Sequence, residues 1–214
     1  MSEYPKIHAP YKRDGKGNLI HGEWARPEIG YLAPLDWLWT EKVDGTNIRL
    51  SWDLSAVRGQ AVNWIAGRTD RAMIPPKLLT RLASMWDALP WGDVFDGAVT
   101  LYGEGYGAGI QKGGGLYRPD PDFVLFDVAV STDRGPLWLH RFDVEDVAVK
   151  LGIDVVRVVM SGPLAVAERA VVDGFDSAWR GVEPEGLVGR PECGLLDRLG
   201  NRVATKVKTK DYRR

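Results

Sequence analysis

The stretch WLWTEKVDGTNIRLSW, residues 37–52, decides the expected fold, because bulky apolar and polar side chains alternate along both of its halves. This alternation is typical of half-buried β-strands, so we expect strands over residues 37–41 and 46–52. Asp44-Gly45 is a hairpin turn signal, and it predicts that the two strands pair with each other. Lys42 then lies at the end of a strand, just before a tight turn, where a rigid scaffold can aim its side chain.

Lys42 is open to two interpretations. As a covalent nucleophile it needs a neutral amine, whereas an unperturbed lysine has a pKa of about 10.4 and is protonated at neutral pH. Nearby cations or removal from water must lower that value before the amine can attack. Alternatively, Lys42 is a solvated turn lysine, which is the commoner situation for a short K-x-D-G match taken alone.

Length and composition predict an ordinary globular protein. The 214 residues are 44% hydrophobic and 27% charged, and the net charge of −1 creates no overall field that would attract nucleic acid. A single cysteine excludes an intrachain disulfide and a multi-cysteine zinc site, and the three histidines lack metal-ligand spacing. Since the sequence has no signal-peptide pattern and no long apolar run, we expect a cytoplasmic protein with no membrane partner.

The remainder of the chain mixes expected strands and helices. Residues 1–35 are rich in Pro, Gly and charge and are expected to be irregular. A helix is expected after Pro75-Pro76, ending at Pro90, because Leu78, Leu82 and Met85 recur at helical spacing. The mixture predicts an α+β fold of antiparallel sheets flanked by helices, with residues 1–214 forming a single domain.

Six polar islands follow one another along the chain, most of them at the ends of expected strands. They are EKVDGTN (41–47), GRT (67–69), LYGE (101–104), FVLFD (123–127), EGLV (185–188) and KVK (206–208). In this order they resemble the motifs of the covalent nucleotidyltransferase superfamily, which includes polynucleotide ligases and mRNA capping enzymes. The Y-G-E element and the glycine-rich residues after it are most similar to the ATP-dependent RNA ligases of the phage RNA ligase 2 type. The resemblance covers residues 37–208.

The resemblance implies a nucleotidyltransferase (ATP-grasp-like) fold with the nucleotide site between its sheets. Lys42 would attack the α-phosphorus of ATP, expel pyrophosphate and carry AMP as a phosphoramidate. Lys206 and Lys208 would contact the α-phosphate and, as cations, help to depress the pKa of Lys42. The remaining implied ATP-binding residues are Glu41 toward the base, Asn47, Glu104 at the ribose, Phe126 stacked on adenine, and Glu185.

The same resemblance implies a divalent metal and an RNA substrate. Glu185 would hold a hydrated Mg²⁺ or Mn²⁺ that offsets charge during phosphoryl transfer, and Asp44 is a further candidate metal ligand. Arg68 and Asn47 would contact the reacting RNA ends. AMP would pass from Lys42 to a 5′-phosphate, and a 3′-hydroxyl would then displace it to form a phosphodiester bond.

Several of these residues have a plainer interpretation when each is taken alone. Lys206 and Lys208 fit the solvent face of an edge strand, Phe126 fits a core aromatic, and Glu104 fits a solvated loop carboxylate. Glu185 fits a surface glutamate before a turn glycine. Arg49 is expected to be a surface cross-strand charge.

The implied function is an ATP-dependent RNA ligase, and two alternatives remain. One is a minimal DNA ligase, which differs only in its polymer. The other is a non-catalytic module that binds nucleotides or RNA ends. No appended OB fold or helical domain is expected after Lys208, so a partner protein or domain is a candidate source of further RNA contacts.

Overall fold

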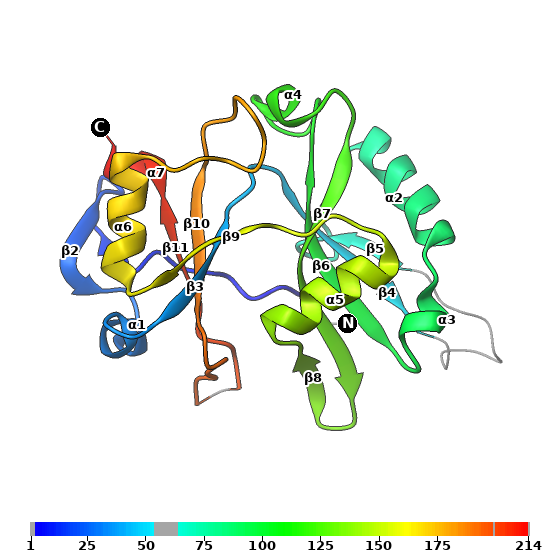
Figure 1. Ribbon diagram of the computed structural model, residues 1–214, viewed down its shortest axis with the longest axis horizontal. Helices are drawn as coiled ribbons and strands as arrows, with labels where there is room; N and C mark the ends of the chain where they lie inside the picture. The colour runs from blue at the N-terminus through cyan, green and yellow to red at the C-terminus, as the bar shows by residue number, and fades with distance from the viewer. Residues whose placement is uncertain (1–2, 54–63, 199, 214) are drawn as a thin grey trace. The chain divides into compact units, whose positions relative to one another are not determined.

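The computed structural model describes residues 3–53, 64–198 and 200–213 (Figure 1). Contacts within the chain divide it into two compact units. Unit 1 contains the stretch up to Tyr4 and residues Asp44–Val156, and unit 2 contains Pro5–Val43 and the stretch from Arg157 onward. The sequence predicted one domain over residues 1–214 and did not indicate this division.

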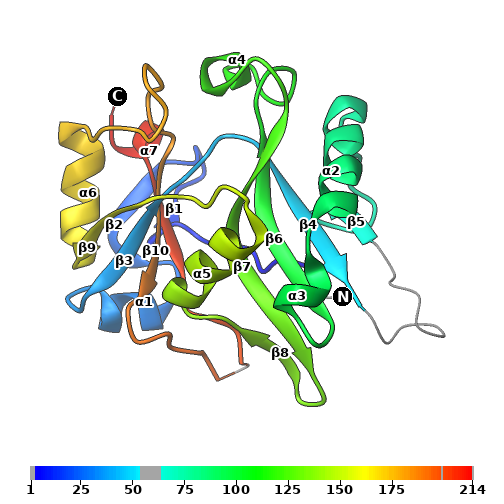
Figure 2. The ribbon, with the colours of Figure 1, turned by 45° about the vertical axis from the view of Figure 1, so that its right-hand side comes forward.

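Unit 1 is built on a five-stranded antiparallel sheet with the strand order β5-β4-β6-β7-β8. Its strands are β4 (Thr46–Trp52), β5 (Trp64–Gly67), β6 (Val99–Tyr106), β7 (Asp122–Thr132) and β8 (Gly135–Trp138). Its helices are α2 (Pro76–Ala88), α3 (Trp91–Val94), α4 (Gly114–Tyr117) and α5 (Arg141–Leu151). Helices α2, α3 and α5 pack on the sheet (Figure 2) through a core that includes Leu50, Leu82, Leu101, Leu125 and Val144.

Helix α2 forms where the sequence predicts it. Pro75 and Pro76 stand at its first turn, where a missing N–H costs nothing, and Leu78, Leu82 and Met85 are buried along one face. The other face points to water.

Unit 2 contains a four-stranded antiparallel sheet with the order β11-β10-β3-β9 and a separate two-stranded sheet, β1-β2. The strands are β1 (Tyr11–Arg13), β2 (Leu19–Trp24), β3 (Trp37–Glu41), β9 (Val158–Gly162), β10 (Gly186–Pro191) and β11 (Thr205–Lys208). The helices are α1 (Pro27–Leu32), α6 (Leu164–Asp173) and α7 (Thr209–Tyr212). Trp37, Trp39 and Val207 from the sheet pack with Leu164 and Val171 of α6 in one buried cluster.

The expected α+β class with antiparallel sheets is confirmed, but the expected hairpin at Asp44-Gly45 is wrong. Strand β3 pairs with β10 and β9, whereas β4 pairs with β5 and β6. Gly45 is needed for another reason: a Cβ there would lie 2.3 Å from the carbonyl oxygen of Gly105. The glycine therefore lets the chain approach β6 closely.

The expectation of an irregular segment over residues 1–35 is also wrong, because β1, β2 and α1 lie within it. The turn between β1 and β2 is held by Asp14, whose carboxylate accepts hydrogen bonds from the backbone N–H groups of Lys16 and Asn18. Gly17 in the same turn has a φ of +85°, which favours glycine. Strand β1 has only three residues, and neither β1 nor β2 contains a buried residue, so neither shows the alternation of buried and exposed side chains that marks a strand.

No helix among the described residues combines the length and the apolar character needed to cross a bilayer.

Candidate active site

Lys42 directly follows β3 and remains tied to the sheet of unit 2. Its backbone N–H donates to the carbonyl oxygen of Gly186, with an N···O distance of 2.9 Å. Its side chain is 21% exposed, and its Nζ lies 2.5 Å from Oε2 of Glu185. The amine is thus held by a carboxylate yet reachable from solvent.

Glu185 binds two lysines at once. Its second oxygen, Oε1, lies 2.5 Å from Nζ of Lys208. Burial by itself raises the pKa of Glu185, but the positive charges and hydrogen bonds of Lys42 and Lys208 outweigh it and hold that pKa below its ordinary value. Glu185 is therefore an ionised partner and a poor proton acceptor. We refer to Lys42, Glu185 and Lys208 as the lysine–glutamate cluster.

Strand register explains why the cluster forms. Gly186 of β10 pairs with Lys208 of β11, which brings the residue before Gly186 beside the lysine. A Cβ on Gly186 would lie 2.1 Å from the carbonyl oxygen of Val207, and its φ is +148°. The glycine of the E-G element is therefore required for the close approach of the two strands.

Lys206 lies on the same face of β11 as Lys208, because side chains alternate along a strand and Val207 between them is buried in the core. The backbone N–H of Lys206 donates to the carbonyl oxygen of His8. The expected edge strand with two lysines on one face is thus observed, but Lys208 makes a specific ion pair that a solvated lysine would lack.

Glu41, the last residue of β3, has partners outside the lysine–glutamate cluster. It is 2% exposed, and its carboxylate accepts hydrogen bonds from Ser177 Oγ at 2.5 Å and from the backbone N–H of Ala178 at 2.8 Å. Glu41 therefore anchors the loop at residues 177–178, and its expected contact with a nucleotide base stays a prediction.

Unit 1 brings together a second group of the expected residues. Asn47 of β4 and Glu104 of β6 are directly opposite each other, so their side chains lie on one face of the sheet. Oδ1 of Asn47 is buried and has no hydrogen-bond partner in the described part of the chain. Buried polar atoms are normally paired, so this oxygen is a candidate contact for a ligand.

Phe126 belongs to β7 at a register shift. Tyr102 pairs with Asp127 and Gly103 pairs with Leu125, so Phe126 is the extra residue of a β-bulge. Its side chain is only partly buried, and the ring of Tyr4 meets it edge-on with the centroids 5.0 Å apart. Because a bulge interrupts the regular alternation of side chains, the ring of Phe126 takes a direction that a regular strand would not give it.

Arg68, which follows β5, is exposed, and its expected contact with RNA stays a prediction, whereas the expected surface position of Arg49 is wrong. Arg49, expected at the surface, is fully buried; its Nε donates to the carbonyl oxygen of Gly67 at 2.8 Å, and its guanidinium pairs with Asp70 at 2.6 Å. Arg49 therefore holds both ends of the short segment that carries Arg68, a role that the alternation pattern did not reveal.

A divalent metal fits this donor set only in hydrated form. Among the described residues no group of three or more His, Cys, Asp or Glu side chains could enclose a metal. Asp44 is partly buried, and its backbone N–H donates to the hydroxyl of Tyr117. An ionised, partly exposed carboxylate such as Glu185 suits Mg²⁺ or Mn²⁺, since Mg²⁺ usually keeps several waters and binds one or two carboxylates plus phosphates.

Comparison with known proteins gives a family match and matches among solved structures. The family model described as RNA ligase matches residues 35–208. Solved structures of Naegleria gruberi RNA ligase are similar in fold: a mutant with ATP and Mn has a TM-score of 0.64 at 18% identity, covering 98% of this chain and 58% of that chain. The form with PPi has a TM-score of 0.66 at 17% identity, covering 98% and 62%. A search among curated proteins found no match.

The chain thus spans about three fifths of the length of these solved ligases.

Proposed function

Because the chain belongs to the RNA ligase family, we propose that it is an ATP-dependent RNA ligase that forms a covalent lysyl-AMP on Lys42. The observation that carries this proposal is the lysine–glutamate cluster. A lysine at a strand end, an ionised glutamate and a second lysine converge within hydrogen-bond distance. A solvated turn lysine would not need a partly buried carboxylate that is shared with another cation.

In the first step, the lone pair of Lys42 Nζ forms a bond to the α-phosphorus of ATP, and the bond to pyrophosphate breaks with its electron pair on the leaving group. Lys42 must separate from Glu185 and lose a proton to solvent before it can attack, because an ammonium has no lone pair. Lys208 would also leave Glu185 and contact the α-phosphate, where its positive charge stabilises the crowded oxygens. Positioning and charge supply most of the acceleration.

Glu185 would hold a hydrated divalent cation, Mg²⁺ or Mn²⁺, whose charge offsets that of the phosphates. In unit 1, the unpaired Oδ1 of Asn47 would accept a hydrogen bond from the substrate, and Glu104 opposite it would accept one from a ribose hydroxyl. Phe126 would stack on adenine. Asp44 stays a candidate metal ligand in this proposal.

Two further displacements complete the reaction. The 5′-phosphate of an RNA strand attacks the phosphorus of lysyl-AMP and releases Lys42, and a 3′-hydroxyl then attacks the activated 5′-phosphate and releases AMP. Arg68, exposed after β5, would contact a phosphate at the reacting ends. RNA is favoured over DNA as the polymer, a partner protein or domain could add RNA contacts, and a cytoplasmic location is to be tested by fractionation.

The test of the first step is retention of label. The protein is incubated with ATP labelled at the α-phosphate and a divalent metal, and is then run on a denaturing gel. We expect label on the wild type and none on Lys42→Ala or Lys42→Arg. ATP labelled at the γ-phosphate is the control, because pyrophosphate carries that label away.

Label from the γ-phosphate would indicate phosphorylation instead of adenylylation. No label with either nucleotide would leave a module that only binds nucleotides or RNA ends. If lysyl-AMP forms, assays on nicked RNA, nicked DNA and hybrid duplexes decide the polymer.

A further inference from the structure

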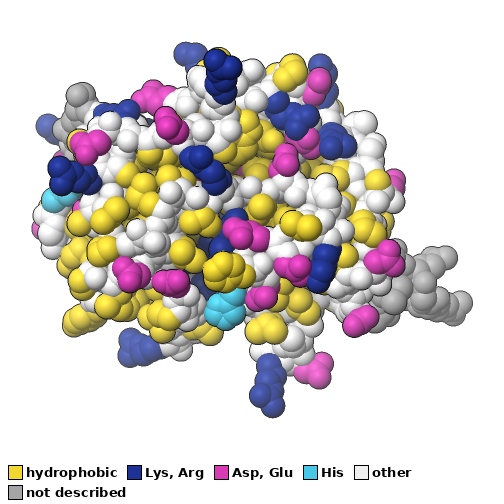
Figure 3. Space-filling model, viewed as in Figure 1, with side chains coloured by type: hydrophobic (Ala, Val, Ile, Leu, Met, Phe, Trp, Pro, Cys, Tyr) yellow, Lys and Arg dark blue, Asp and Glu magenta, His cyan; other side chains and the backbone are white. Residues whose placement is uncertain are grey.

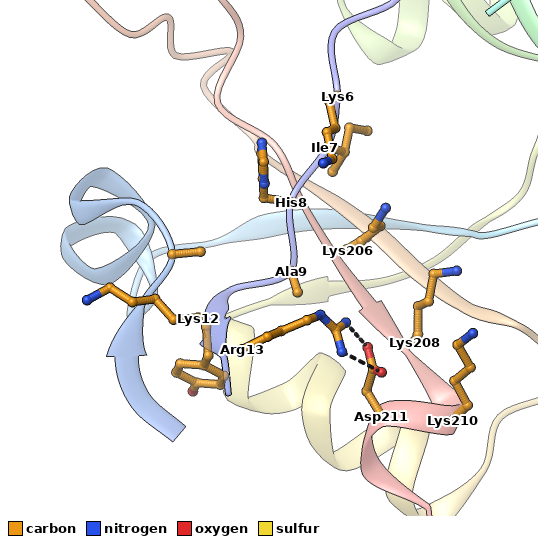
Figure 4. A pocket seen from close by; sticks show the side chains of 12 residues that line it. Lys6, Ile7, His8, Ala9, Lys12, Arg13, Lys206, Lys208, Lys210 and Asp211 are labelled. Carbon is orange, nitrogen blue, oxygen red and sulfur yellow. Dashed lines mark hydrogen bonds and ion pairs between the residues drawn. The ribbon is translucent and has the colours of Figure 1, made fainter. Parts of the chain in front are cut away.

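A basic pocket of about 390 Å³ lies in unit 2 (Figure 4). Its walls come from the N-terminal stretch of the unit, from β1 and from β11 with α7. Six cationic side chains line it, namely Lys6, Lys12, Arg13, Lys206, Lys208 and Lys210. Among the described residues of its lining, Asp211 is the single acidic side chain.

The acidic residue does not neutralise the lysines. Asp211 receives two hydrogen bonds from Arg13, at 2.6 and 3.1 Å, so its charge is balanced by that guanidinium. Lys12 contacts Glu23 only at 3.4 Å, and both of those side chains are more than half exposed, which makes the pair weak. Lys6 and Lys210 form no ion pair with any described residue. The pocket therefore keeps a positive excess.

This excess is local. The net charge of the chain is −1, and on the face seen in Figure 3 Lys and Arg side chains are interspersed with Asp and Glu. A concentration of cations in one concave site needs a specific cause, because like charges that are close together destabilise the fold.

The N-terminal stretch reaches the pocket by pairing with β11. His8 forms a parallel bridge with Thr205, and its carbonyl oxygen accepts hydrogen bonds from Lys206 N at 3.1 Å and Thr205 Oγ1 at 3.0 Å. This pairing brings Lys6 beside the lysines of β11. Burial, then the charges of Lys6, Arg26 and Lys206, lower the pKa of His8, so the fold itself places this side chain among cations.

An aromatic side chain completes the lining. Tyr11 lies in the pocket wall, and its ring is held by His21 and Trp24, each with its centroid 4.9 Å away. Proteins that bind single-stranded nucleic acid combine a positive groove along the backbone with aromatic rings against the bases. The pocket has both features.

Lys208 belongs both to this pocket and to the lysine–glutamate cluster. We infer that the pocket binds a single strand of RNA through its phosphates and delivers that strand to Lys42. The inference rests on the proposed function for the identity of the polymer. In Figure 4, Lys12 lies on the opposite side of the pocket from Lys208, the cation that contacts Glu185, and this extent favours a strand over the triphosphate of one nucleotide.

The test is a binding titration with a fluorescent single-stranded RNA that ends in a 5′-hydroxyl, so that it cannot accept AMP. The triple variant Lys6→Ala, Lys12→Ala, Lys210→Ala keeps every residue of the cluster. We expect weaker binding to all sequences alike, and a slope of log K against log salt that is smaller by about 2, at about 0.7 per lost phosphate contact. The label retained from α-labelled ATP should be unchanged.

The matched control removes three exposed lysines outside the pocket, with Lys16→Ala, Lys77→Ala and Lys150→Ala, and so changes the net charge equally. An equal loss of RNA affinity in both triple variants would overturn the inference. So would intact RNA binding with an increased KM for ATP, because the pocket would then hold the triphosphate. Failure of lysyl-AMP formation in the wild type would instead refute the proposed function, and the binding titration still reports on the pocket.

Discussion

The lysine–glutamate cluster of unit 2 and the Asn47 face of unit 1 satisfy their polar groups in opposite ways. In the cluster, three charged side chains hold one another at 2.5 Å. On the sheet face of unit 1 that carries Asn47 and Glu104, the buried Oδ1 of Asn47 has no partner among the described residues. A site that pairs its own charges is stable but must open before it reacts, whereas an unpaired buried oxygen costs stability and gains its bond only with a ligand. The two regions should therefore respond differently to substitution.

The largest effect is expected from Glu185→Gln, which removes the charge that organises both lysines. Lysyl-AMP formation should fall about 100- to 1,000-fold, as is typical for loss of one preorganised electrostatic group. Single-turnover labelling with α-labelled ATP measures it. Glu183→Gln is the matched control, because Glu183 lies two residues away, is 73% exposed and pairs only with Arg213 among the described residues. Equal losses in both variants would contradict the role of the cluster.

Asn47→Ala should separate activity from stability. Removing a buried oxygen that has no partner should leave the free energy of unfolding unchanged or slightly higher, while lysyl-AMP formation or sealing falls about 10- to 100-fold through the lost substrate hydrogen bond. Ser51→Ala on the same strand is the opposite case, since its hydroxyl is hydrogen-bonded to Thr100 at 2.8 Å. That variant should lose about 1 kcal/mol of stability and keep its activity. Urea unfolding measures the stability of Asn47→Ala and Ser51→Ala, and the labelling and sealing assays measure their activity.

A smaller effect is expected at Arg49. Arg49→Met should leave the carbonyl oxygen of Gly67 unpaired and release Asp70, lowering stability by about 1–3 kcal/mol and sealing by a few-fold through the displaced Arg68. Asp70→Asn should cost less than about 1 kcal/mol, because Asp70 is 57% exposed. If the two variants are equally destabilised, the buried guanidinium is not what holds the segment.

Local patterns predicted the elements well and their pairing poorly. Pro75-Pro76 and the leucine spacing place α2 correctly, and the alternation around Lys42 places β3 and β4. The expected hairpin is wrong because β3 and β4 belong to different sheets. Gly45 is required because a Cβ there would collide with the carbonyl oxygen of Gly105. Such a contact between strands far apart in the sequence leaves no local pattern.

The site shows the same limit. Motif order brought Lys42, Glu185 and Lys208 into one hypothesis, and the structure brings them into contact although Lys42 and Glu185 are 143 positions apart. Arg49 was misjudged because β4 is buried on both faces over most of its length, so alternation no longer separates inside from outside. Nothing in the first residues indicated that His8 would pair with Thr205, because one bridge has no sequence signature.

The smallest expected effect is the pH dependence of the cluster. Lys42 and Lys208 hold the pKa of Glu185 below its ordinary value of 4.5, so its contribution to stability is fully present above that value and is lost as pH falls through the lower, folded-state pKa. The difference in unfolding free energy between the wild type and Glu185→Gln should thus be constant above about pH 5, at about 1 kcal/mol, and narrow below it. Urea unfolding between pH 3 and pH 7 measures this difference.

The same series with Asn47→Ala should show a constant difference from the wild type, because an amide does not titrate. A pH-dependent difference for Asn47→Ala would mean that its face also contains a charge pair, and the contrast between the two regions would no longer hold.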